Sequence, residues 1–128
     1  MNYLLLIAGI ISLSAVAGHF TMGVKDFLKP VLSSDIDIVP KKVMHSLFHY
    51  MSVFMSLTTA ILFSFSFNEN LVFTNQNDVL MFIGISYAGF AISQFLIALN
   101  SGIKMGVFKL FQWVFWLLIS VLSLLSAY

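Results

Sequence analysis

Four long apolar segments, separated by shorter polar stretches, set the pattern along this chain. They cover about residues 3–22, 43–67, 79–99 and 106–127. Each approaches or exceeds the ~20 residues that an α-helix needs to cross the ~30 Å hydrocarbon core of a bilayer. A helix also satisfies its own backbone hydrogen bonds in lipid. The pattern therefore predicts an all-α membrane protein, a four-transmembrane-helix bundle that forms one transmembrane domain over residues 1–128.

Composition supports a membrane location. Hydrophobic residues make up 60% of the chain and charged residues 9%, whereas an ordinary soluble domain carries about 25% charged residues. No Lys or Arg precedes the first apolar segment, so we expect a helix there rather than a signal peptide. We expect a multi-pass protein of the cell inner membrane, with the lipid bilayer as its partner. A net charge of +1 is too small for a nucleic-acid partner.

The lysines predict the orientation in the membrane. The connection over residues 24–42 holds Lys25, Lys29, Lys41 and Lys42, and Lys104 precedes the fourth segment, with Lys109 just inside it. The connection between the second and third segments has no basic residue. Cytoplasmic loops are enriched in basic residues, so both termini are predicted outside and the longer 24–42 loop in the cytoplasm. Its mixture of apolar and basic residues suits a segment lying in the membrane interface.

All three histidines fall at the predicted cytoplasmic end. His19 closes the first segment, and His45 and His49 begin the second, four residues apart on one helical face. Small residues extend both faces deeper into the membrane: Ala8, Ser12 and Ala15 on the first segment, and Ser52, Ser56 and Ala60 on the second. Small side chains allow membrane helices to approach closely. We therefore expect these two stripes to pack together and to bring His19 level with the other two histidines.

Polar residues on the other two segments lie at a similar depth. Gln94 stands on the third segment and Gln112 near the start of the fourth. Polar side chains within a membrane are costly, which makes them candidates for a functional site. The candidate ligand-binding residues are His19, His45, His49, Gln94 and Gln112.

The chemistry of such a site is left open by the sequence. Three imidazoles could hold a metal ion such as Zn²⁺ or copper, with His19, His45 and His49 as the ligands. A haem could be held between His19 and one histidine of the second segment. A quinone-like ligand or a proton relay would also use these groups. In the structural alternative, the histidines bond to water, lipid phosphate or backbone at the headgroup level, and the stripes are ordinary packing.

Three functions follow from these alternatives. The first is a ligand-binding membrane protein. The second is a non-catalytic accessory or scaffold subunit of a larger membrane complex, or a homo-oligomer. The third is a small transporter. An enzyme is the least favoured, because the few polar residues form no recognisable set of nucleophile, base and orienting group.

The first half of the chain resembles a group of small uncharacterised bacterial four-helix integral membrane proteins. That group has a His at the end of helix one and a Trp-His at the start of helix two. The matching pieces here are His19, the apolar-Pro-apolar stretch around Pro30, Lys41-Lys42 and Phe48-His49. The chain differs in having Met22-Gly23 where the group has Gly-Glu, and Phe48 in place of Trp. The resemblance implies a four-helix fold and draws attention to His19 and His49.

Overall fold

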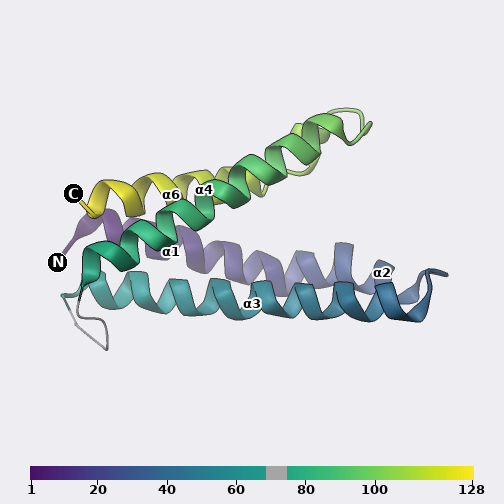
Figure 1. Cartoon of the computed structure of the whole chain (residues 1–128), viewed down its shortest axis with the longest axis horizontal. Helices are drawn as coiled ribbons and strands as arrows, with labels where there is room; N and C mark the ends of the chain where they lie inside the picture. Colours follow the sequence, from purple (N-terminus) through teal and green to yellow (C-terminus); the bar gives the residue numbers. More distant parts are fainter. Residues whose placement is uncertain (69–74) are drawn as a thin grey trace.

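The computed structural model describes residues 1–68 and 75–128, and every regular element in them is helical. The chain forms two long hairpins (Figure 1). The first hairpin consists of a continuous helix, divided into α1 (Tyr3–Gly18), η1 (His19–Leu28) and α2 (Lys29–Ser33), followed by α3 (Ile38–Ser66). The second consists of α4 (Gln76–Asn100), the short α5 (Gly106–Lys109) and α6 (Trp113–Ser126). The predicted all-α class is confirmed.

Three helices of the described residues are long and apolar enough to cross a membrane. They are Tyr3–Ser33, Ile38–Ser66 and Gln76–Asn100. Trp113–Ser126 is apolar but shorter. The connection expected between the second and third segments falls partly on residues 69–74, which lie outside the described residues.

The predicted loop over residues 24–42 is wrong. The first helix continues to Ser33 and α3 begins at Ile38, so only residues 34–37 connect them. Both prolines of this stretch lie in the first turn of a helix, Pro30 in α2 and Pro40 in α3. Pro40 is tolerated because the N–H groups of a first helical turn have no intrahelical partner, whereas Pro30 follows η1 without a break and removes one backbone donor from the continuous helix. The mixed apolar and basic sequence is thus a helix with one buried side, on which Gly23 and Leu28 lie.

The predicted fourth helix, 106–127, is interrupted. Residues 110–112 separate α5 from α6. Gly106 allows the chain to fold back, because a Cβ on it would lie 2.6 Å from Ser101 Oγ and 2.7 Å from the Ala98 carbonyl oxygen. The Trp113 indole N–H then donates to the Val107 carbonyl at 3.1 Å, which fixes the turn.

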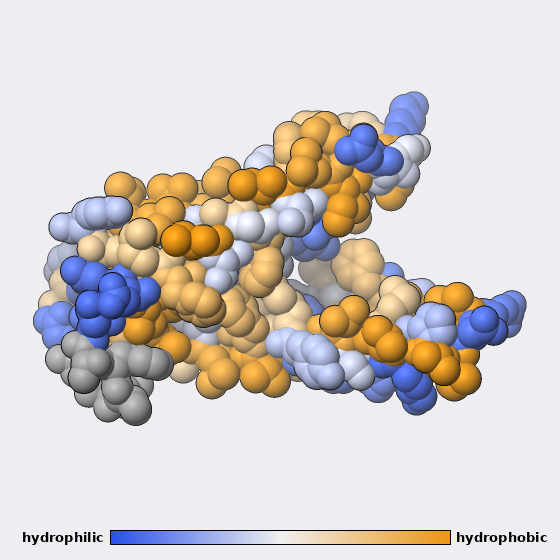
Figure 2. Space-filling view, in the orientation of Figure 1, coloured by the Kyte–Doolittle hydropathy of each residue, from blue (hydrophilic) through white to orange (hydrophobic). Residues whose placement is uncertain are grey.

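The apolar core lies in the half of the molecule that holds both termini. Its fully buried members come from all four long helices: Leu5, Ala8, Leu62, Phe65, Leu80, Ile83, Tyr87 and Ile119. Toward the other end the two hairpins diverge (Figure 1), and Figure 2 shows a hollow between them there. Residues at that end therefore belong to one hairpin or the other, which decides how the candidate site residues are distributed.

Candidate functional site

The first hairpin is held together by a seam of small and polar residues. On α1 the buried side chains are Leu5, Ala8 and Ser12, and His19 continues the row into η1. On α3 they recur at alternating steps of three and four: Ser52, Met55, Thr59, Leu62 and Ser66. This spacing keeps contact positions facing a partner helix over many turns.

The predicted stripe on the second segment is correct only in part. Ser52 is buried in the seam, but Ser56 and Ala60 are exposed. Steps of four residues turn by about 40° each around a helix of 3.6 residues per turn. A stripe drawn only with such steps therefore rotates out of the interface, and Thr59 takes the position expected for Ala60.

Two polar bridges cross the seam one heptad apart. Ser12 Oγ lies 2.6 Å from Thr59 Oγ1, and both side chains are buried. One heptad further along each helix, His19 Nε2 lies 2.8 Å from Ser52 Oγ. The same nitrogen lies 3.2 Å from the Phe48 carbonyl oxygen. These bridges fix the register of the antiparallel pair.

His19 is held on several sides. Its ring stacks on the Phe48 ring, with centroids 3.9 Å apart and an interplanar angle of 16°. The Ser52 hydroxyl donates to the Phe48 carbonyl at 3.0 Å, so its oxygen is left to accept from His19. The tautomer with the proton on Nε2 satisfies all of these groups. His19 therefore acts as a staple between the two helices.

His45 and His49 form a separate pair on α3. Their Nε2 atoms are 3.0 Å apart and their ring centroids 4.9 Å apart. His49 is exposed and His45 half-buried. The Phe48 and His49 rings are nearly perpendicular, with an interplanar angle of 87° and centroids 5.7 Å apart. Phe48 thus contacts His19 with its face and His49 at right angles.

The structure brings the histidines to one end of the first hairpin but not into one set of three ligands. Among the described residues, no group of three or more His, Cys, Asp or Glu side chains is placed to hold a metal ion. The ring nitrogens that converge are those of His45 and His49, while His19 Nε2 is engaged by Ser52.

Gln94 and Gln112 lie on the second hairpin, which diverges from the histidines (Figure 1). Both are half-buried. Gln112 Oε1 is buried without a hydrogen-bond partner among the described residues. Nothing in the described part joins either glutamine to the histidine pair by a hydrogen bond.

An unusual helix geometry accompanies the histidines. Residues His19–Leu28 form a π-helix, which is rare beyond a single turn and occurs frequently at functional sites. Gly23 of this segment is buried, and a Cβ on it would lie 3.5 Å from the Phe48 ring. The wide turn therefore packs on the same aromatic ring that separates His19 from His49.

Sequence reasoning missed a buried hydroxyl cluster at the centre of the molecule. Tyr87 of α4 is fully buried, and its hydroxyl lies 2.8 Å from Thr58 Oγ1. Thr58 neighbours Thr59, whose hydroxyl is bonded to Ser12 of α1, so two adjacent hydroxyl contacts link α3 to α4 and to α1. The available signal was Tyr87 itself, because a tyrosine buried within a long apolar segment needs a hydrogen-bond partner for its hydroxyl.

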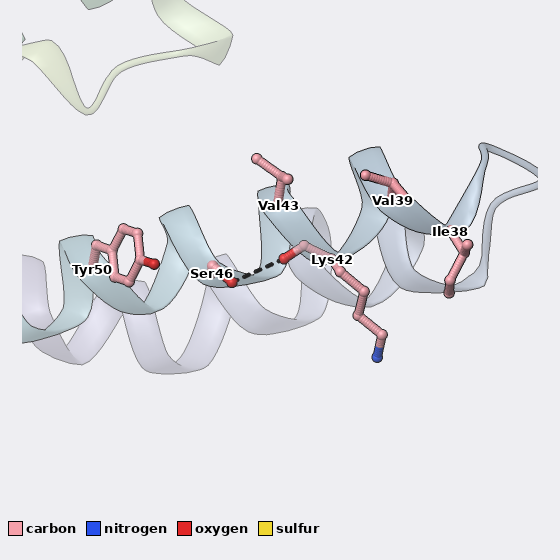
Figure 3. A pocket seen from close by; sticks show the side chains of 6 residues that line it. All are labelled: Ile38, Val39, Lys42, Val43, Ser46 and Tyr50. Carbon is pink, nitrogen blue, oxygen red and sulfur yellow. Dashed lines mark hydrogen bonds between the residues drawn. The ribbon is translucent and has the colours of Figure 1, made fainter.

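A shallow groove of about 360 Å³ lies on α3 near its first turn, lined by Ile38, Val39, Lys42, Val43, Ser46 and Tyr50. Figure 3 shows Val39 and Val43 projecting to one side of the helix and the Lys42 side chain to the other. None of the histidines lines it. With one charged group and an otherwise largely apolar lining, this groove offers little chemistry for a functional site.

Fold and site together define an all-helical protein with several membrane-compatible helices and a histidine pair at one end. In the comparisons with known proteins, no family model, no curated protein and no solved structure matches the chain.

Proposed function

We propose that this chain is a multi-pass protein of the inner membrane that binds a small ligand at the histidine-bearing end of its first hairpin. The observation that carries the proposal is the convergence of His45 Nε2 and His49 Nε2 at 3.0 Å on an accessible helix face. Two imidazole nitrogens this close together on one helix favour a ligand that binds to both of them.

The membrane part of the proposal rests on surface and length. Large apolar side chains cover the outer faces of all four long helices, among them Leu13, Leu57, Phe82, Ile92 and Leu125. On the face of the molecule seen in Figure 2, hydrophobic residues form broad surfaces. In water such a surface would drive aggregation, whereas in a bilayer it faces acyl chains.

Four crossings require the second hairpin to use α5 as well as α6. The 14 residues of α6 span about 21 Å at 1.5 Å per residue, which is shorter than the ~30 Å hydrocarbon core. The turn at residues 110–112 and α5 add the missing length. The fourth crossing is then a broken helix, interrupted at residues 110–112.

The orientation part rests on where the lysines lie. All six basic residues of the chain are lysines, and they lie in η1, α2, the first turns of α3 and the α4–α6 turn. These elements form the end away from both termini (Figure 1). The positive-inside rule places that end, and the histidines with it, on the cytoplasmic side.

Among the ligands considered, a haem fits least well. It would need His19 on the side of the iron opposite a histidine of α3, and His19 Nε2 is engaged by Ser52. His45 and His49 cannot be the two axial ligands of one iron, because they share a helix face. A metal ion or a quinone-like ligand does not require His19 as a ligand on the opposite side.

The test is to purify the protein and its His49→Ala variant from membranes in mild detergent. Elemental analysis, the visible spectrum and organic extraction then report metal, haem and quinone. We expect one species at near-stoichiometric amount in the wild type and its loss in the variant, with unchanged helicity. A blank in all three measurements, also after dialysis against the candidate ligands, contradicts the proposal.

The second candidate function is that of a non-catalytic subunit, within a homo-oligomer or a larger complex. The observation that favours it is the hollow between the diverging hairpins (Figure 2), which a further helix would fill. Cross-linking in intact membranes followed by mass determination tests it, since a purely monomeric protein excludes this function.

A further inference from the structure

We infer that His45 and His49 form a bidentate site for a first-row transition-metal ion, and that His19 takes no part in it. The inference rests on the proposed function and names the ligand of that site. It replaces a cluster of three histidines by a chelating pair on a single helix.

The separation of the two nitrogens matches a chelate. Imidazole nitrogens bind such ions at ~2.0–2.1 Å. Two of them lie about 2.9 Å apart in adjacent positions of a square-planar or octahedral ion, and about 3.4 Å apart around a tetrahedral one. The observed Nε2–Nε2 distance is 3.0 Å. Cu²⁺ and Ni²⁺, which favour tetragonal geometry, therefore match this separation, and Zn²⁺ requires the nitrogens to move apart by a few tenths of an ångström. In either case the proton shared by the two rings must leave and both lone pairs must turn toward the ion.

The pair is also free to bind. His49 is exposed and His45 half-buried, and within the described residues neither ring makes a hydrogen bond except to the other. His19 differs, because its Nε2 is bonded to Ser52 and its ring is stacked on Phe48. If His19 Nε2 bound a metal ion, its hydrogen bond to Ser52 across the seam would be lost. We therefore assign the chelate to His45 and His49 alone.

The chemistry of the donors selects the class of ion. Imidazole suits copper, nickel and zinc, while Mg²⁺ and Ca²⁺ require oxygen donors. No carboxylate joins the histidines in a group of three or more among the described residues. The remaining coordination positions are left to water or an exchangeable ligand.

A hydrogen bond between two neutral imidazole rings gives a similar distance. The test must therefore distinguish a pair that only bonds to itself from a pair that binds a metal ion. Metal-stripped protein in lipid nanodiscs is titrated with Cu²⁺, Ni²⁺ and Zn²⁺, with Mg²⁺ as the negative control. Electron paramagnetic resonance of the Cu²⁺ form reports the number of nitrogen donors. We expect Cu²⁺ to bind tightest, with coupling to two nitrogens.

The matched control moves one histidine off the shared face. The double variant His49→Ala, Tyr50→His keeps the histidine content, but places the new ring about 140° around the helix from His45. Tyr50 is 67% exposed, so the change perturbs little packing. We expect Cu²⁺ affinity to fall by about tenfold or more in His49→Ala and in the double variant, since the second donor of a chelate binds at high effective concentration.

His19 variants decide whether the third histidine contributes. His19→Ala, or His19→Gln if the alanine variant does not fold, should keep the wild-type affinity and the two-nitrogen signal. An equal loss of affinity in His19→Gln overturns the inference, as does wild-type binding by the double variant. If purified protein carries a haem or quinone that depends on His49 but shows no His49-dependent copper binding, this inference fails while the proposed function stands. If no ligand of any class depends on His49, both fail.

Discussion

At the scale of single residues, the three histidines differ in what holds them. His19 is bonded to Ser52, stacked on Phe48 and placed at the start of a π-helix. Within the described residues, His45 and His49 make a side-chain hydrogen bond only to each other, and His49 is exposed. A residue whose nitrogen is already engaged stabilises the fold, whereas a pair of accessible nitrogens is available for a ligand.

The staple can be measured by a double-mutant cycle. His19→Ala and Ser52→Ala should each lower the free energy of unfolding in detergent, and the two changes should couple by about 0.5–1.5 kcal/mol, the range for a net hydrogen bond. Additive effects, with no coupling, would show that the 2.8 Å contact contributes nothing.

The sequence predicted which residues belong to this end but not their roles. The four-residue spacing of His45 and His49 was enough to place both on one face. The engagement of His19 depends on the Ser52 hydroxyl and the Phe48 carbonyl, which lie far away in sequence. Such a partnership follows from the register of two helices, and no local pattern contains it.

At the scale of elements, the seam between α1 and α3 follows a heptad rather than a run of four-residue steps. Ser52 and Thr59 face α1, while Ser56 looks outward. The prediction from sequence favoured a stripe of small residues. It therefore assigned Ala60 to the facing position that Thr59 occupies. The π-helix that follows Gly18 was not predicted either. The basic residues and the proline at positions 25–30 are typical of a loop.

Enlarging the seam should be costly only on its buried side. Thr59→Leu removes the bond to Ser12 and inserts a larger side chain where both partners are buried. We expect it to lower the free energy of unfolding by ~1–3 kcal/mol, the usual cost of overpacking. Ser56→Leu, one step away on the exposed face, is the matched control and should be near neutral. The reverse order of costs would show that the seam runs along the other face.

The contact between α4 and α6 gives a second pair of variants. A Cβ at Gly84 would lie 2.6 Å from Leu124 Cγ, whereas a Cβ at Gly89 would meet nothing within 4 Å. Gly84→Ala should therefore destabilise by ~1–3 kcal/mol. Gly89→Ala should be neutral or stabilising by up to about 1 kcal/mol, because alanine favours a helix. Thermal unfolding in one detergent compares them, and equal effects would contradict the close approach of α4 and α6.

At the scale of the whole molecule, two hairpins share a core near the termini and separate at the lysine-rich end (Figure 1). Hydropathy predicted helical segments, since apolar length is a strong signal. It did not predict the divergence, which places Gln94 and Gln112 on a different hairpin from the histidines. Depth along a helix is readable from sequence, but the lateral position of each helix is not.

The orientation makes a direct prediction for intact cells. The chain has no cysteine, so a single introduced cysteine is the only thiol. Asp35→Cys in the connection after α2 should resist a membrane-impermeant thiol reagent, and Asn77→Cys in the first turn of α4 should be labelled. Both sites are exposed in the structure. Labelling at position 35 but not at position 77 would invert the orientation.

We have proposed that one end of the first hairpin holds a structural histidine, His19, beside a ligand-binding pair, His45 and His49. The most direct measurement is the unfolding temperature of the wild type, His19→Ala and His49→Ala in detergent, each with and without saturating Cu²⁺. A ligand that binds only the folded state raises this temperature. His19→Ala should unfold at a lower temperature than the wild type but keep the Cu²⁺-induced rise. His49→Ala should unfold at the wild-type temperature and lose that rise. A loss of the rise in both variants, or in neither, would contradict the division of roles.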